Sequence, residues 1–294
     1  MKNHKSKVLA LCVATALLYG CGSDSNSTMD VQAYDGPVRG MIPSYSCDNG
    51  SNGTSDATND KGIATIEGSF ADNPESCTIS FKGGSDAIDM ENGRDMSGVQ
   101  YSAPKGLFTK DGKVTVSPLT TLIDKQLNGA EYNESTATEV LADLGLDEIP
   151  NNGVSIQELL SDTESAVTKL KGDNPTLFSK LAATKMILSD VVQSQPDLEP
   201  EKLAAVTKKL SDSLVSSMPN FPLDNSGKEV VVNLKDKLQD TDFVNKVESG
   251  EVSADEIKDT LEENLDDATK PEPTDPDTPA TGGTGGTGSA GTGA

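Results

Sequence analysis

From residue 30 to about residue 105, hydrophobic and polar positions alternate in short runs. The clearest runs are Val31–Tyr34, Val38–Ile42, Ile63–Ile66 and Cys77–Phe81. Turns rich in glycine, asparagine and aspartate, such as Asp35-Gly36-Pro37, separate the runs. A period of two between such turns is typical of short strands that bury one face. Residues 30–113 are therefore predicted to form a small β-sandwich domain.

From residue 114 to residue 268 the hydrophobic spacing changes to that of amphipathic helices. Two apolar stripes stand out, formed by Leu177, Leu181, Leu188 and Val192 and by Leu203, Val206, Leu210 and Leu214. Ser155 and Ser253 are each followed three residues later by glutamate, which is the spacing of a capping box at a helix start. Residues 114–268 are predicted to form about six or seven helices packed as a bundle.

The last segment, residues 269–294, is rich in proline and then in glycine and threonine. Such a composition cannot bury enough apolar surface to offset the entropy of ordering the chain. This tail is therefore predicted to be disordered.

The first twenty residues have the three-region plan of a secretory signal peptide. Three lysines precede an apolar run from Val8 to Leu18, and the run is too short to span a bilayer. The sequence Leu18-Tyr19-Gly20-Cys21 then resembles the lipobox of bacterial lipoproteins. This resemblance implies cleavage before Cys21, a diacylglyceryl group on its thiol and acylation of the new amine. The alternative is an ordinary secreted protein in which Cys21 is incidental.

The lipobox resemblance also implies a location. In that family an aspartate after the lipidated cysteine retains the protein in the inner membrane, and here Gly22 follows. Several acyl chains hold a protein far more firmly than one, since each buried methylene adds roughly 0.8 kcal/mol. We therefore expect a lipid-anchored protein of the outer membrane, with residues 21–29 as a flexible tether. Which face of that membrane it occupies stays open.

Two of the four cysteines are left for the folded part of an exported chain. Cys12 leaves with the signal peptide and Cys21 carries lipid, so Cys47 and Cys77 remain. Outside the reducing cytosol, two such cysteines most simply form one disulfide. The sequence thus predicts an α+β chain in two parts: a small disulfide-linked β-sandwich followed by an α-helical bundle, with a disordered C-terminal tail.

The charge of the chain excludes several classes of partner and chemistry. Removal of residues 1–20 takes away three lysines, the single histidine and no acid, which changes the net charge from −23 to −26. Nucleic acid and anionic lipid headgroups are poor partners for such a chain. Without histidine, a Ser-His-Asp or Cys-His arrangement and a histidine-bearing zinc site cannot form. Paired carboxylates stay open, although the lack of tryptophan disfavours a glycosidase cleft.

Several segments occur in an order that resembles one module of bacterial surface lipoproteins. They are Asp35–Gly40, Asn59–Ile63, Lys82–Asp86, Ser102–Gly106 and Val114–Leu122. In that family a carboxypeptidase-regulatory-like, or Sdr-B-like, β-domain runs into a helical segment through a Val-x-Pro-Leu-Thr-Thr-Leu junction, which here is Val116–Leu122. The resemblance covers roughly residues 30–195. It implies an architecture and no particular activity.

The loop after Cys47 is a candidate calcium site. Asp48, Asn52 and Asp56 supply side-chain oxygens in a glycine-containing segment, and Ca²⁺ takes six to eight oxygens from such a loop. No glutamate closes the segment as a bidentate ligand. The alternative is an Asn/Asp/Gly surface turn between strands.

These features lead to a non-catalytic outer-membrane lipoprotein that acts as a protein-interaction or surface-assembly module. The expected partners are the membrane, through the lipid on Cys21, and an envelope or surface protein; nucleic acid is not expected. An alternative is a Ca²⁺-assisted adhesin or glycan-binding lipoprotein, although few aromatic residues are present for sugar stacking. An accessory factor of a secretion or surface-assembly machine is a third reading that the sequence does not separate from the first.

Overall fold

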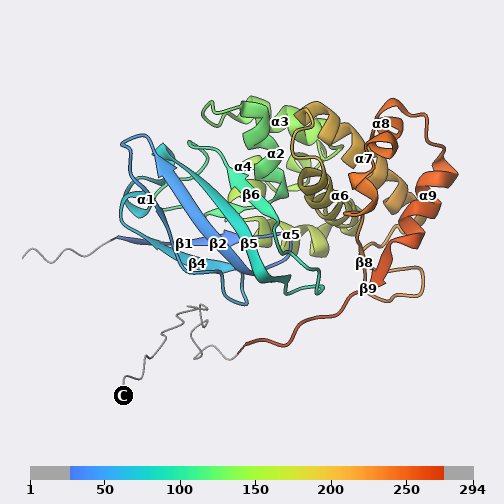
Figure 1. Ribbon diagram of the computed structural model, residues 1–294, viewed down its shortest axis with the longest axis horizontal. Helices are drawn as coiled ribbons and strands as arrows, with labels where there is room; N and C mark the ends of the chain where they lie inside the picture. Colours follow the sequence, from blue (N-terminus) through green and yellow to red (C-terminus); the bar gives the residue numbers. More distant parts are fainter. Residues whose placement is uncertain (1–26, 275–294) are drawn as a thin grey trace, which may run out of the picture.

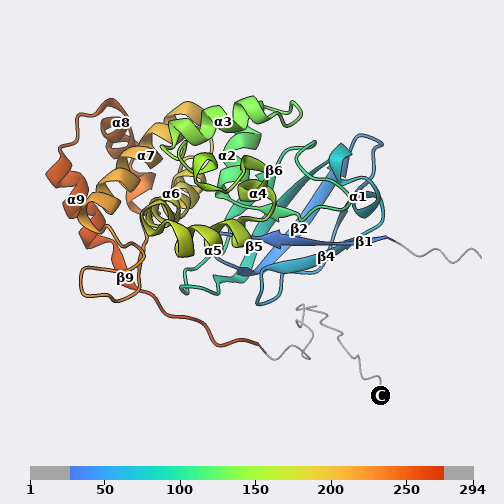
Figure 2. The ribbon, with the colours of Figure 1, turned by 180° about the vertical axis from the view of Figure 1, so that it is seen from behind.

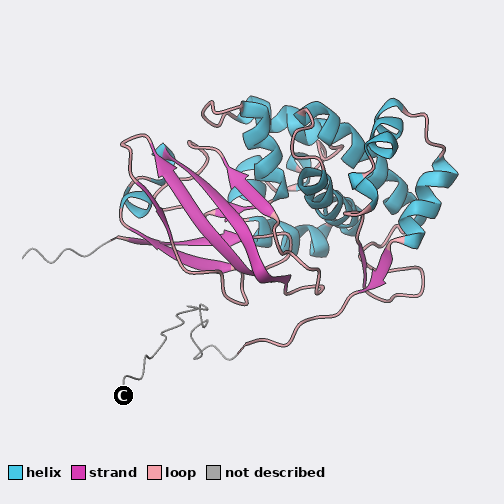
Figure 3. Cartoon of the chain, viewed as in Figure 1, coloured by secondary structure: helices cyan, strands magenta, loops and turns pink. Residues whose placement is uncertain are grey.

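The computed structural model describes residues 27–274 of the chain (Figure 1). The predicted signal peptide, the predicted lipidation site Cys21 and the tail from residue 275 lie outside the described residues. Most of the strands gather in one half of the molecule and most of the helices in the other (Figure 3). The fold is therefore α+β, as the sequence predicted.

The sheet half contains two sheets. Its elements are β1 (Thr28–Ala33), β2 (Val38–Cys47), β3 (Asn52–Thr54), β4 (Ile63–Glu67), α1 (Ser69–Asp72), a 3₁₀ turn (Pro74–Ser76), β5 (Cys77–Asp89), β6 (Gln100–Ala103) and β7 (Thr115–Val116). One sheet has the strand order β4-β1-β7 and the other β3-β2-β5-β6. β1 begins inside the segment expected to be tether, and β7 lies inside the expected helical part, where it pairs in parallel with β1.

The longest strand pair, β2 with β5, follows the period-two pattern of the sequence. Met41, Ile79 and Phe81 point inward and are buried, whereas the residues between them face solvent. Cys47 and Cys77 are direct register partners at the end of this pair and form the predicted disulfide. The disulfide therefore joins the last residue of β2 to the first residue of β5.

The helical half contains eight helices between residues 118 and 263. They are α2 (Pro118–Leu127), α3 (Glu134–Asp143), α4 (Ile156–Ser161), α5 (Thr163–Asp173), α6 (Pro175–Ser194), α7 (Pro200–Ser217), α8 (Thr241–Ser249) and α9 (Ala254–Glu263), with 3₁₀ turns at Pro150–Asn152 and Lys237–Gln239. Ser155 and Ser253 accept hydrogen bonds from the backbone N–H of the third helical residue, as the capping spacing predicted. No helix of the described chain is long and apolar enough to cross a bilayer.

The Val-x-Pro-Leu-Thr-Thr-Leu segment forms the junction between the two halves. Ser117 and Thr120 cap α2 reciprocally, and Pro118 occupies its first turn. The Thr120 hydroxyl also donates to the carbonyl of Ser102 in β6 at 2.8 Å, while the Thr121 hydroxyl accepts from the Ser102 N–H at 2.9 Å. The two threonines thus bind the backbone of a sheet strand to the first turn of a helix.

α6 is the central helix of the helical half and is buried along most of its length. Asn174 caps it and Pro175 begins it. It packs against α2, α5 and α7. Its apolar residues join those of the strands in one continuous core, so the sheet half and the helical half have no separate interiors. Two independently folded modules would each have a hydrophobic core of their own, whereas these two halves share one.

The C-terminal part of the described chain departs from the predicted all-helical pattern. β8 (Val230–Val232) and β9 (Leu265–Asp267) pair antiparallel beyond α7 and α9. The chain then returns to the sheet half, as Figures 1 and 2 show from opposite sides. The Thr269 N–H donates to the carbonyl of Asn92 at 2.9 Å, and the Thr274 hydroxyl donates to Asp60 at 3.1 Å. Residues 269–274, expected to begin the disordered tail, are therefore bound to the fold.

Replacing both Cys47 and Cys77 by serine should lower the free energy of unfolding by about 3 to 4 kcal/mol, because the bond closes a loop of 30 residues. Urea unfolding of the oxidised wild type and of the double variant measures this. Reductant provides the control: it should lower the free energy of unfolding of the wild type and leave that of the double variant unchanged. Equal stability of the two oxidised proteins would contradict the prediction.

Candidate functional site

The predicted calcium ligands lie before, at the start of and after the short strand β3. Asp48, Asn52 and Asp56 are all exposed, and the Asp48 carboxylate accepts hydrogen bonds from Lys105 at 3.1 and 3.3 Å. Asn52 lies in edge strand β3 and its amide contacts the carbonyl of Gly50. Within residues 27–274, no group of three or more His, Cys, Asp or Glu side chains is placed to hold a metal ion. Calcium binding at this loop stays a prediction, and an ammonium group already neutralises one of its carboxylates.

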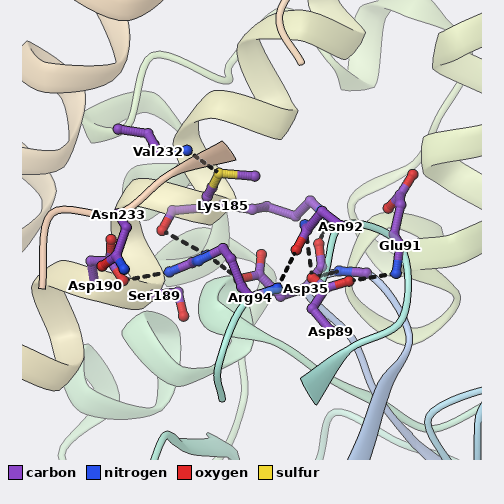
Figure 4. Close-up of polar contacts among 12 residues, drawn as sticks. Asp35, Asp89, Glu91, Asn92, Arg94, Lys185, Ser189, Asp190, Val232 and Asn233 are labelled. Atoms are coloured by element: carbon purple, nitrogen blue, oxygen red, sulfur yellow. Dashed lines mark hydrogen bonds and ion pairs between the residues drawn. The ribbon is translucent and has the colours of Figure 1, made fainter. Parts of the chain in front are cut away.

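A buried polar cluster lies where the sheet half meets the helical half (Figure 4). Its central residue is Arg94, in the loop between β5 and β6. The Arg94 guanidinium forms ion pairs with Asp35, in the turn after β1, at 3.2 Å and with Asp190, in α6. The side chains of Arg94, Asp35 and Asp190 are only 6%, 2% and 3% exposed. The cluster therefore joins three segments that are distant in sequence in a nearly water-free interface.

Neighbouring groups satisfy the remaining polar atoms of this cluster. The Lys185 ammonium donates to the carbonyl of Asp35 at 2.6 Å and lies 4.7 Å from the centre of the Tyr34 ring. The Tyr101 hydroxyl lies 2.7 Å from that of Ser189 and donates to Asp35 at 3.3 Å. These contacts matter because a buried charge is tolerated only when it is paired and hydrogen-bonded.

Asp190 extends the cluster toward the C-terminal part of the chain. Its second oxygen accepts from the Leu234 N–H at 2.8 Å, just after β8. One turn earlier in α6, the Met186 sulfur accepts from the Val232 N–H at 3.3 Å. α6 thus holds the Arg94 loop on one side and the segment around β8 on the other.

Asp89 shapes the loop that carries Arg94. Its carboxylate accepts from the N–H groups of Gly36 and Glu91 and from the Asn92 amide, at 2.8 to 3.2 Å. Burial and, to a smaller extent, the negative charge of Asp35 raise the pKa of Asp89, and the backbone hydrogen bonds oppose the rise, so that the net pKa is about 6. The conformation of the loop therefore depends on a carboxyl group whose ionisation at neutral pH destabilises the folded state.

Burial and charge act differently on the three central groups. Burial raises the pKa of Asp190, while the Arg94 guanidinium partly offsets that effect. Burial alone would lower the pKa of Arg94, but the carboxylates of Asp190 and Asp35 outweigh it and the net change is upward. Burial also raises the pKa of Tyr101 well above its usual value. The guanidinium consequently stays charged, and the arrangement is an ion-pair cluster closed to solvent.

The sequence contained a signal for this cluster that the hydrophobic pattern concealed. Lys185 and Asp190 interrupt the apolar sequence of α6, which is buried along most of its length, between Leu181 and Val191. A charged residue on an otherwise buried helix face requires a buried partner. Arg94 carries no such signal, because it lies in an Asn-Gly-Arg-Asp loop that resembles an ordinary surface turn.

Two open hollows lie on the surface of the helical half. One, of about 640 Å³, lies between α7 and α9, and the other, of about 410 Å³, lies beside the start of α5. Their charged lining residues are Lys209, Asp212, Asp255 and Lys258 in the first and Lys113, Asp162, Glu164 and Lys169 in the second. Both hollows are lined by side chains of both signs of charge, which gives no preference for one class of ligand.

Comparison of the chain with protein-family models, with curated proteins and with solved structures finds no match. The interpretation of the site therefore depends on its own geometry.

Replacing Arg94 by methionine should lower the free energy of unfolding by about 3 to 5 kcal/mol, because it leaves Asp35 and Asp190 buried without their cation. Chemical unfolding at neutral pH measures the loss. Lys258→Met is the matched control, since it removes a cation from an exposed pair with Glu262 and should cost less than about 1 kcal/mol. Equal losses in the two variants would exclude a special role for the cluster.

Titration of Asp89 should lower the free energy of unfolding as the pH rises from 4 to 6. Its pKa is about 6 in the folded protein against 3.8 for the free side chain, so the folded state binds the proton more tightly. The free energy of unfolding therefore decreases as pH rises through this window, by about 3 kcal/mol from this group. Urea unfolding of wild type and Asp89→Asn from pH 4 to pH 7 isolates the effect. A constant difference between them across this range would refute it.

Proposed function

We propose that this protein is a non-catalytic outer-membrane lipoprotein whose folded part acts as a protein-interaction or surface-assembly module. The observation that carries the proposal is Leu18-Tyr19-Gly20-Cys21 at the end of a short apolar run. In this reading the strands form a β-sandwich and the helices form a bundle, and both are exported and held at the membrane by lipid on Cys21.

The position of the first strand supports a membrane-proximal sheet half. Thr28, the first residue of β1, is seven positions after Cys21. A chain of that length spans at most about 25 Å when fully extended. The helices of the helical half, α2 to α9, lie away from this end of β1 (Figure 2). The anchor would therefore hold the sheets near the membrane and present the helical half outward.

The environment of the charged groups supports a non-catalytic role. The ionisable side chains that pair around Arg94 are almost completely buried. A catalytic group must reach its substrate within hydrogen-bonding distance. A closed ion-pair cluster instead fixes two parts of a fold relative to each other, as an interaction module requires.

Replacing Cys21 by serine should move the protein from the outer-membrane fraction to the soluble envelope fraction, because the thioether-linked lipid is lost. Density fractionation of cells and mass spectrometry of the N-terminal peptide measure this. The Cys47→Ser/Cys77→Ser protein is the control and should stay with the membrane. A wild-type protein that is soluble, or whose mature N-terminus is not a lipidated Cys21, would overturn the proposal.

A further inference from the structure

After β9 the chain crosses the surface from the helical half to the sheet half (Figures 1 and 2). Residues 269–274, which we call the strap, make this crossing. Every residue of the strap is exposed or half-buried, whereas all three residues of the neighbouring β8, Val230–Val232, are buried. The strap therefore lies on the fold without contributing a side chain to its core.

Polar contacts near its two ends hold the strap on the sheet half. The Thr269 N–H donates to the carbonyl of Asn92 at 2.9 Å, and the Thr274 hydroxyl donates to the Asp60 carboxylate at 3.1 Å. Arg39 pairs with the same carboxylate at 2.9 Å and leaves it 22% exposed. Contacts that water can reach add little net stability, because water replaces them when they break. The docked position of the strap thus depends on a few replaceable hydrogen bonds.

The sequence of the strap suits a segment that can leave its position without disturbing the fold. Pro271 and Pro273 have no N–H, so the strap cannot pair as a regular strand with a neighbouring edge. Their restricted φ angles favour an extended chain whether the strap is docked or not, which lowers the conformational entropy that docking costs. Opening of the strap therefore breaks no sheet ladder and removes no side chain from the core.

The docked strap covers the loop that carries Arg94. Gly93 has a φ of +83°, and a Cβ at this position would collide with the carbonyl oxygen of Thr269. Within the loop, the Asn92 side chain accepts from the Arg94 N–H at 2.9 Å and donates to Asp89 at 3.1 Å. The residue whose carbonyl holds the strap therefore also fixes the backbone of Arg94.

We infer that the strap opens and closes over the Arg94 loop while both halves stay folded, and that its closed position restrains this loop in the conformation that pairs Arg94 with Asp35 and Asp190. The inference goes beyond the proposed function and does not depend on lipid at Cys21. The coupling is reciprocal. A partner that holds the strap open loosens the Arg94 loop, and a loosened loop favours the open strap.

Native-state hydrogen exchange tests the opening at single amides by NMR, on residues 21–294 with Cys21→Ser. The Thr269 N–H should exchange roughly 10- to 1000-fold more slowly than in an unstructured peptide, through a local opening whose rate low urea concentrations leave unchanged. The Leu234 N–H, which donates to Asp190 at 2.8 Å, should exchange far more slowly and only through global unfolding.

A first pair of variants tests whether the two ends of the strap are released together. Thr274→Val removes the hydroxyl that binds Asp60 and should lower the protection of the Thr269 N–H about fivefold. Thr65→Val is the matched control, because it removes an exposed hydroxyl that donates to Asp30 at 2.7 Å, away from the strap. This control should leave the protection of Thr269 unchanged.

A second pair tests the effect of the strap on the loop. Thr269→Pro removes the donor to Asn92 and should accelerate exchange of the Gly93 N–H, which donates to the Asp89 carbonyl at 2.8 Å, about tenfold. Glu272→Pro introduces a proline into the strap and keeps the Thr269 donor, so it should leave the Gly93 rate unchanged.

The outcomes that would overturn the inference are distinct. Equal exchange rates for Thr269 and Leu234 would mean that the strap leaves only when the whole protein unfolds, and a fully unprotected Thr269 would mean that it never closes. Equal effects within either pair of variants would remove the cooperative release or the coupling to the loop. A strap variant that raises the Leu234 rate by the same factor acts on the whole fold and also overturns the inference.

Discussion

The relation between the two halves of this protein depends on one buried guanidinium. Arg94 leaves the loop between β5 and β6 and lies between carboxylates from the turn after β1 and from α6. Removing charges from water costs several kcal/mol per ion, and only well-placed partners offset that cost. A small displacement of the helices relative to the sheets would separate these partners. The cluster therefore selects one relative orientation more than it adds net stability.

Contacts on the surface reinforce the same orientation. Thr269, beyond β9, binds the carbonyl of Asn92 in the Arg94 loop, and Asp89 holds that loop from within. At the other end of the sheet, Thr120 and Thr121 bind α2 to β6. With a continuous apolar core between these contacts, the molecule behaves as one body. The proposed lipid anchor on Cys21 would therefore carry both halves as one unit.

Sequence pattern and composition predicted those features of the fold that are determined by residues close together in the chain. The alternation in β2 and β5, the caps of α4 and α9 and the Cys47–Cys77 bond were all predictable, because each follows from short spacings or from elimination. The cluster was not, because Asp35, Arg94 and Asp190 are brought together only by the tertiary fold. The attachment of residues 269–274 was missed for a similar reason: a proline-rich composition predicts weak local structure and cannot reveal backbone hydrogen bonds to a distant loop.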